Sequence, residues 1–284
     1  MPDLDGNLPA GARRFRCGAF GGRQQPRATR ADCRRASHRN LCGYRSMCLI
    51  VFAWKLLPEC PLVLAANRDE FFNRPSQAAH WWDDHPFVYA GRDLQSGGTW
   101  LGMNRSGRFA ALTNIRKGAE QRTDARSRGE LVADFLQSDL SAEDYLAHVR
   151  ERSADYNGFN LLLGDHQRSF WFSNEGETSM MQLEPGIYGL SNGSLDTPWP
   201  KVLRAKAQFS SLLCQGAPDA AYFEMLADTT HAADARLPDT GVSLEWERLL
   251  SPICIESPEY GTRASTLLRV NSSGQAHMNE RVIR

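Results

Sequence analysis

The stretch Met47-Cys48-Leu-Ile-Val-Phe-Ala-Trp54, followed by Pro61-Leu-Val-Leu-Ala-Ala-Asn-Arg-Asp-Glu70, marks the beginning of the folded part of this chain. Both apolar runs are nearly continuous, and a short break separates them. Such runs are typical of strands that are buried on both faces, so we expect a β-hairpin. A hairpin pairs the end of its second strand with the start of its first. The sequence therefore predicts that Cys48 lies beside Asn67-Arg-Asp-Glu70.

The 46 residues before Met47 contain ten arginines and only three acidic side chains, and they show neither helical nor strand periodicity. We expect residues 1–46 to be a disordered extension. Three interpretations are open: sequence upstream of a true start at Met47, which we favour, an arginine-rich transit peptide, or a propeptide whose removal exposes Cys48. A secretory signal is excluded, because no apolar core follows the basic stretch.

The composition from Met47 onward limits the class of protein. This part carries 23 basic and 30 acidic side chains, a net charge of −7, which argues against nucleic acid as the main partner. No apolar run is long enough to span a membrane. The cysteines form no CxxC pattern, so a reduced, cytoplasmic compartment fits best. The oligomeric state cannot be read from the sequence.

Strands and helices alternate in blocks. After the hairpin, short strands are expected to about residue 113, and then two helices that open with the capping-box patterns Ser127-Arg-Gly-Glu130 and Ser141-Ala-Glu-Asp144. Further strands and helices follow, with a strand expected over 253–255. This order favours antiparallel or mixed sheets covered by helices in one domain, 47–284, and argues against a Rossmann fold.

Cys48 is the candidate nucleophile. If Met47 is removed, Cys48 becomes the first residue, and its thiol lies next to an α-amino group with an ordinary pKa of about 7.7–8.0. That amine can act as the general base for the thiol. An internal Cys48 would have only a non-basic amide beside it. The alternative interpretation is a small side chain that packs within an apolar strand.

The four polar residues that end the second run cannot all enter a core. Because side chains alternate along a strand, we expect Asn67 and Asp69 to face one way and Arg68 and Glu70 the other. They indicate a cleft or the edge of a sheet. The alternative is a strand end held by salt bridges.

Three other features admit both functional and structural interpretations. Gly97-Gly-Thr-Trp-Leu-Gly102 fits a binding groove or a turn with a bulge. Asn114 and Asn160 flank apolar strands, where an amide can donate to an oxyanion or simply hold a loop. The seven histidines form no HExxH pattern, so no metal site is assigned.

At Cys48, Asn67–Glu70, Gly98-Thr-Trp-Leu-Gly102 and Leu112-Thr-Asn114, the chain resembles the NRDE family, also called the transport and Golgi organisation protein 2 family. The likeness continues through four more segments: Gly158–Leu161, Leu190–Asn192, Leu195–Lys201 and Tyr260–Thr266. It covers essentially all of 47–284. Members of this family typically begin with Met-Cys, which favours a misassigned start.

The resemblance implies an α+β fold, a four-layer αββα sandwich of the N-terminal-nucleophile hydrolase type, related to choloylglycine and penicillin V hydrolases. It implies a set of catalytic residues: Cys48 as nucleophile, Arg68 and Asp69 to orient thiol and amine, Asn114 and Asn160 for the oxyanion, and Arg263 in the charge network. Expected substrate contacts are Asn67, Gly98, Trp100 and Asn192. In the hydrolases the arginine and aspartate are several residues apart. Here they are adjacent, so a regular strand would separate them and only a bulge would align them.

Two functions are therefore carried forward. The first is a cysteine amidohydrolase or acyltransferase that acts on a small or lipid-like acylated compound without a cofactor. The second is a non-enzymatic carrier of haem or another hydrophobic ligand, because animal relatives are implicated in haem trafficking. Its expected contacts are Trp81, Trp82, Trp100 and His80 or His85. A scaffold of secretory membranes has no support in the sequence.

Overall fold

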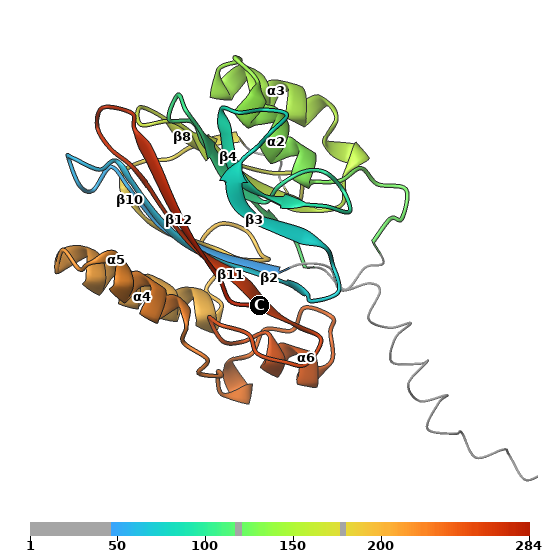
Figure 1. Ribbon diagram of the computed structural model, residues 1–284. Coiled ribbons are helices and arrows are strands. Elements are labelled where there is room, and N and C mark those ends of the chain that lie inside the picture. The colour runs from blue at the N-terminus through green and yellow to red at the C-terminus, as the bar shows by residue number, and fades with distance from the viewer. Residues whose placement is uncertain (1–46, 117–120, 177–179) are drawn as a thin grey trace, which may run out of the picture. The chain divides into compact units, whose positions relative to one another are not determined.

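The described residues build two antiparallel β-sheets that pack against each other, with helices on both outer faces (Figure 1). The computed structural model describes residues 47–116, 121–176 and 180–284. The predicted extension over 1–46 lies outside the described residues, so its interpretation stays a prediction.

The first sheet has five strands in the order β10-β1-β2-β11-β12. They are β1 (Met47–Trp54), β2 (Leu62–Phe71), β10 (Gly186–Leu190), β11 (Tyr260–Val270) and β12 (Ala276–Val282). The hairpin predicted from the sequence is therefore the centre of this sheet, and strands from late in the chain flank it.

The second sheet has seven strands, which follow one another in sequence order. They are β3 (Ser76–Trp81), β4 (Val88–Asp93), β5 (Leu101–Asn104), β6 (Phe109–Asn114), β7 (Phe159–Gly164), β8 (Ser169–Ser173) and β9 (Met180–Gln182). Each strand pairs with its neighbour in the chain, as expected for a series of hairpins.

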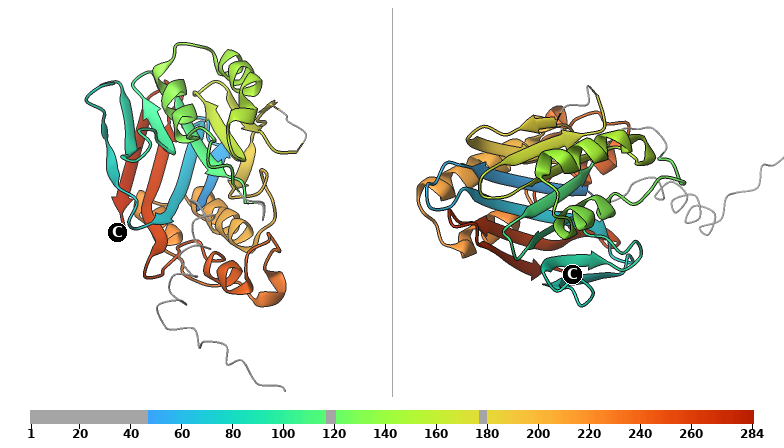
Figure 2. Two further views of the ribbon diagram at one scale, coloured as in Figure 1. Left: turned by 90° about the vertical axis from the view of Figure 1, so that its right-hand side faces the viewer. Right: turned by 90° about the horizontal axis from the view of Figure 1, so that it is seen from above.

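The helices cover the outer faces of the two sheets. They are α2 (Gly129–Gln137), α3 (Ala142–Glu151), α4 (Pro200–Cys214), α5 (Asp219–Leu226) and α6 (Leu244–Leu249), with short 3₁₀ turns at Ser153–Asp155 and Asp234–Arg236. Figure 2 shows the green helices α2 and α3 on the opposite side of the two sheets from the orange helices α4 and α5.

Strand β1 shows why its sequence is continuously apolar. Leu49 and Val51 pack against α4 and α5, whereas Ile50 and Phe52 pack between the two sheets. A third cluster fills the space between the seven-stranded sheet and α2 and α3. The layers thus run helix, sheet, sheet, helix, and the predicted four-layer αββα sandwich is confirmed.

One of the two capping-box predictions was wrong. Ser141 caps α3 by accepting a hydrogen bond from the Asp144 backbone, as predicted. No side chain caps the first turn of α2, because Glu130 bonds instead with Arg126 and the hydroxyl group of Tyr156. The start of α2 therefore has no side-chain cap within the described structure.

The prediction of a strand over 253–255 was also wrong. This buried segment is irregular, because the Cys254 amide donates to the Asp228 carbonyl oxygen at 2.8 Å and the Ile255 amide donates to the hydroxyl group of Thr262 at 2.9 Å, which is not a strand ladder. The Asn67 amide donates to the carbonyl oxygens of Leu226 and Ile253, at 2.8 and 2.9 Å, and its oxygen accepts from Ser265. Asn67 thus joins β2 to the end of α5 and to the irregular segment.

We expect Asn67→Ala to lower the free energy of unfolding by about 1–3 kcal/mol for each carbonyl left buried without a donor. Denaturant unfolding followed by circular dichroism measures this loss. Asn279→Ala, at an exposed position of β12, is the control and should change stability by less than about 0.5 kcal/mol. Equal effects of the two substitutions would contradict the structural role of Asn67.

Candidate functional site

The pairing of β1 with β2 brings Cys48 beside the polar motif. In this antiparallel register Cys48 lies opposite Arg68, and Met47 lies opposite Asp69. Residues that lie opposite each other across two strands share a face of the sheet. The predicted adjacency is confirmed. Cys48 is 2% exposed, and its carbonyl oxygen accepts a hydrogen bond from Ser191 at 2.9 Å.

The motif is divided between the two faces of the sheet. Arg68 and Glu70 line a cavity on the side of the second sheet. Asp69 is fully buried on the other side, where its carboxylate accepts a hydrogen bond from Thr262 at 2.7 Å. The register between β1 and β2 is unbroken, so no bulge in that pairing brings Arg68 and Asp69 to one face.

The bulge lies on β11 instead. Thr262 pairs with Asp69 and Ala264 pairs with Arg68, so Arg263 is the extra residue between them. A bulge places two consecutive side chains on one face. Arg263 and Ala264 both line the cavity.

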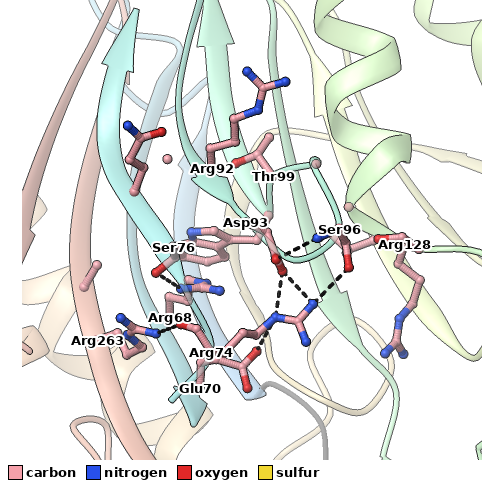
Figure 3. A pocket seen from close by; sticks show the side chains of 18 of the residues that line it. Arg68, Glu70, Arg74, Ser76, Arg92, Asp93, Ser96, Thr99, Arg128 and Arg263 are labelled. Carbon is pink, nitrogen blue, oxygen red and sulfur yellow. Dashed lines mark hydrogen bonds and ion pairs between the residues drawn. The ribbon is translucent and has the colours of Figure 1, made fainter. Parts of the chain in front are cut away.

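The cavity has a volume of about 270 Å³ and lies between the ends of the two sheets (Figure 3). Five of the predicted site residues line it: Arg68, Gly98, Trp100, Asn114 and Arg263. Residues from β2, β4, β6, β11, β12 and the start of α2 contribute to its walls. The cavity therefore collects segments that are far apart in the sequence.

Gly98 forms both a turn and a wall of this cavity. A Cβ atom there would lie 2.4 Å from the carbonyl carbon of Gly129, a distance that no side chain tolerates. The next backbone amide, that of Thr99, donates to the Gly129 oxygen at 3.1 Å. Glycine at 98 thus lets the segment before β5 pack directly on the start of α2.

The two asparagines expected to contribute to the oxyanion site differ in where their side chains lie. Asn114 lines the cavity. Asn160 donates both amide protons, to Thr113 at 3.0 Å and to Gly193 at 2.8 Å, and accepts from Trp171. Asn160 therefore has no amide proton left for an oxyanion in this arrangement.

Two of the expected substrate contacts are also used within the structure. The Asn67 side chain faces the helix layer and holds α5, as described above. Asn192 is 1% exposed, and its amide donates to the Asn114 carbonyl oxygen at 2.8 Å. These expectations are corrected: Asn67 and Asn192 support the walls of the site rather than face its cavity.

A buried lysine is the main feature that the sequence did not reveal. Lys201, near the start of α4, is 3% exposed, and no described residue is a hydrogen-bond partner of its amine. Burial lowers the pKa of Lys201 to about 8, opposed chiefly by the charge of Asp69 and more weakly by Cys48. Burial likewise raises the pKa of Asp69 to about 6, opposed first by Lys201. Each of these two buried opposite charges thus moderates the pKa shift of the other.

Arg116 and Glu247 extend this buried cluster. The guanidinium of Arg116 lies 3.1 Å from the Glu247 carboxylate and packs over Trp199. Burial lowers the pKa of Arg116, and the charge of Glu247 opposes that shift. One signal in the sequence could have identified Lys201: the chain has only four lysines, and this one shares a predicted helix with the apolar Val202.

Comparison with known proteins identifies the family. The family model for Transport and Golgi organisation 2 matches residues 47–284. The chain belongs to this family. It is 37% identical to the mouse Transport and Golgi organization 2 homolog over 256 residues, which is 83% of this chain and 92% of the relative. The human homolog is 36% identical over 256 residues, again 83% of this chain and 92% of the relative.

Among solved structures, the chain is similar to a Caenorhabditis elegans N-acylethanolamine-hydrolyzing acid amidase ortholog, with 9% identity and a TM-score of 0.47. That match covers 78% of this chain and 92% of the other. A likeness of this degree says nothing about which residues act.

Two features are absent from the described residues. None of their helices is long and apolar enough to cross a membrane. No three histidine, cysteine, aspartate or glutamate side chains among them gather so as to hold a metal ion.

We expect Asp69→Asn to lower the free energy of unfolding at pH 7 by about 1–3 kcal/mol, because the buried amine of Lys201 then loses the carboxylate whose charge favours its protonation. The double substitution Asp69→Asn with Lys201→Met should recover most of this loss. Denaturant unfolding of the four proteins in this cycle gives the coupling energy. Additive effects of the two substitutions would contradict the pairing.

The same pair predicts a pH dependence of stability. Since folding raises the pKa of Asp69 from 3.8 to about 6, the folded state binds more protons than the unfolded state in this interval. The contribution of Asp69 to the free energy of unfolding therefore falls as pH rises from about 4 to 6. We expect Asp69→Asn to remove this decrease. An unchanged pH profile of unfolding would show that Asp69 titrates normally.

Proposed function

We propose that this chain is a cysteine amidohydrolase or acyltransferase whose nucleophile is the Cys48 thiolate once Met47 has been removed. The observation that carries the proposal is the pairing of Cys48 with Arg68, whose side chain lines the cavity. Membership of the family, whose model matches from Met47 onward, supports it.

The proposed reaction has two steps. The Cys48 sulfur attacks the carbonyl carbon of an amide or thioester while the α-amine accepts the thiol proton. The bond from carbon to the leaving nitrogen or sulfur then breaks, and the leaving group takes that proton. Water or an acceptor amine attacks the acyl-enzyme and restores the thiol.

The neighbouring residues have distinct proposed roles. Arg68, on the same face as Cys48, stabilises the thiolate. Asp69 lies opposite Met47, so removal of Met47 leaves the α-amine next to its carboxylate, which orients it. Asn114, at the cavity wall, donates to the oxyanion.

The carrier hypothesis receives less support from the geometry. Trp82 is 1% exposed within the core beneath α2 and α3, and its ring nitrogen donates to the Ala90 carbonyl oxygen. Trp100 lines the cavity instead. The side chains expected to hold haem therefore do not share one surface, and this residue set does not fit the group.

The test is to trap an acyl-enzyme. Protein that begins at Cys48, incubated with a panel of amides and thioesters, should gain the mass of one acyl group, located at Cys48 by peptide mapping. Cys48→Ala should reduce turnover by at least about 1000-fold. Cys254→Ala is the matched control, because Cys254 is also a buried cysteine and should leave turnover unchanged. Acylation that survives Cys48→Ala, or none across the panel, would contradict the proposal.

A further inference from the structure

The cavity lined by Arg68, the strand partner of Cys48, is rich in positive side chains. Its walls include seven arginines against three carboxylates, an excess of four positive charges. The arginines are Arg68, Arg74, Arg92, Arg126, Arg128, Arg263 and Arg284. The chain from Met47 onward has a net charge of −7, so this concentration does not follow from composition.

Three of these arginines are each held by a carboxylate. Arg74 lies 2.7 Å from Asp93, Arg92 lies 2.7 Å from Asp84, and Arg126 lies 2.7 Å from Glu130. Their charges are compensated within the protein, and Figure 3 shows Arg74 turned toward Asp93 and Glu70.

Arg68 and Arg263 differ from these three. Within the described structure, no carboxylate lies at ion-pair distance from either side chain. Arg68 is 9% exposed, and among the described residues it donates to the neutral hydroxyl group of Ser76, at 3.2 Å. Arg263 donates to the backbone oxygens of Phe71 and Arg74. Both guanidinium groups are therefore bound to neutral acceptors at the wall of a cavity (Figure 3).

The pairing of β2 with β11 makes these two cations neighbours. The bulge on β11 places Arg263 next to Ala264, the strand partner of Arg68. Burial, and then the charge of Arg68, lower the pKa of Arg263. Two like charges held close together are unfavourable unless an anion joins them.

The carboxylate that faces Arg68 from β12 is already used. Glu280 accepts a hydrogen bond from the backbone amide of Ala79 at 2.7 Å, and burial raises its pKa. Among the described residues it forms no ion pair with either arginine, so it does not bridge them.

The start of α2 adds to the positive potential. Arg128 and Gly129 line the cavity, and no side-chain oxygen caps the first turn of this nine-residue helix. The positive end of a helix dipole favours an anion at this position.

We infer that Arg68 and Arg263 bind an anionic group of the substrate, a carboxylate or a phosphate, beside Cys48. The paired guanidinium groups offer the bidentate hydrogen bonds that such groups accept. That the anion belongs to the substrate rests on the proposed function, whereas the binding of an anion does not. Cys48 and Arg68 are cross-strand neighbours, so the anion lies within a few bonds of the carbonyl that is attacked. The substrate class is thus an acylated compound with its negative charge close to the scissile bond.

The experiment uses Cys48→Ala protein, which cannot react, so that binding is measured apart from catalysis. The protein is titrated calorimetrically with inorganic phosphate and, separately, with acetate, at a constant ionic strength set by chloride. Each titration shows either one saturable binding site or no binding. We expect at least one anion to saturate, and the tighter one identifies the group. Arg263→Gln should weaken its binding at least 10-fold, and Arg263→Lys should weaken it less, because a charge remains.

Arg92→Gln is the matched control. It removes one positive charge from the same cavity, but a charge that Asp84 already compensates, so binding should change less than twofold. Thermal unfolding of each variant verifies that it is folded. Arg68→Gln repeats the test on the second arginine, and the glutamine amide of that variant can still donate to Ser76. Absence of saturable binding with both anions, or equal losses in Arg92→Gln and Arg263→Gln, would overturn the inference.

The two proposals fail differently. If neutral acyl compounds acylate Cys48 as fast as anionic ones of the same length, the anion site is overturned and the nucleophile stands. If anions bind but no compound acylates Cys48, the nucleophile is overturned and the anion site stands.

Discussion

The alternation of side chains along β2 is the constraint on which the site depends. It directs Arg68 into the cavity between the sheets and Asp69 into the layer between the sheet and α4. One strand thereby supplies a cation to the face that holds the Cys48 side chain and an anion to the other face, beside the position of Met47. Under the proposed function, these adjacent residues of opposite charge would serve the thiol and the amine separately.

This division explains the two charged regions on either side of the sheet. On the cavity side, arginines exceed carboxylates, and Arg68 and Arg263 donate to neutral acceptors. On the helix side, Asp69 and Lys201 compensate each other in full burial. The first region is suited to bind an anion from outside, and the second is suited to hold the end of β1 in place.

The sequence predicted the parts of the site that depend on local pattern. Continuous apolar runs predicted the hairpin, and the hairpin predicted that Cys48 and the polar motif are neighbours. It could not predict the bulge at Arg263, because register between β2 and β11 depends on residues about 190 positions apart. Nor could it show that the charge of Lys201 acts on Asp69, since that requires α4 to pack across the sheet. The sequence also predicted that Asn67 and Asn160 contact the substrate, because it could not show that their partners are distant backbone groups.

The central claim is that the α-amine of Cys48 activates its own thiol. The most direct measurement is the rate of Cys48 alkylation by iodoacetamide at pH 7, compared between protein that begins at Cys48 and protein that retains Met47, with the modified residue located by mass spectrometry. The account predicts faster alkylation when Cys48 is the first residue, because the amine then accepts the thiol proton. Equal rates, or slower alkylation without Met47, would contradict it.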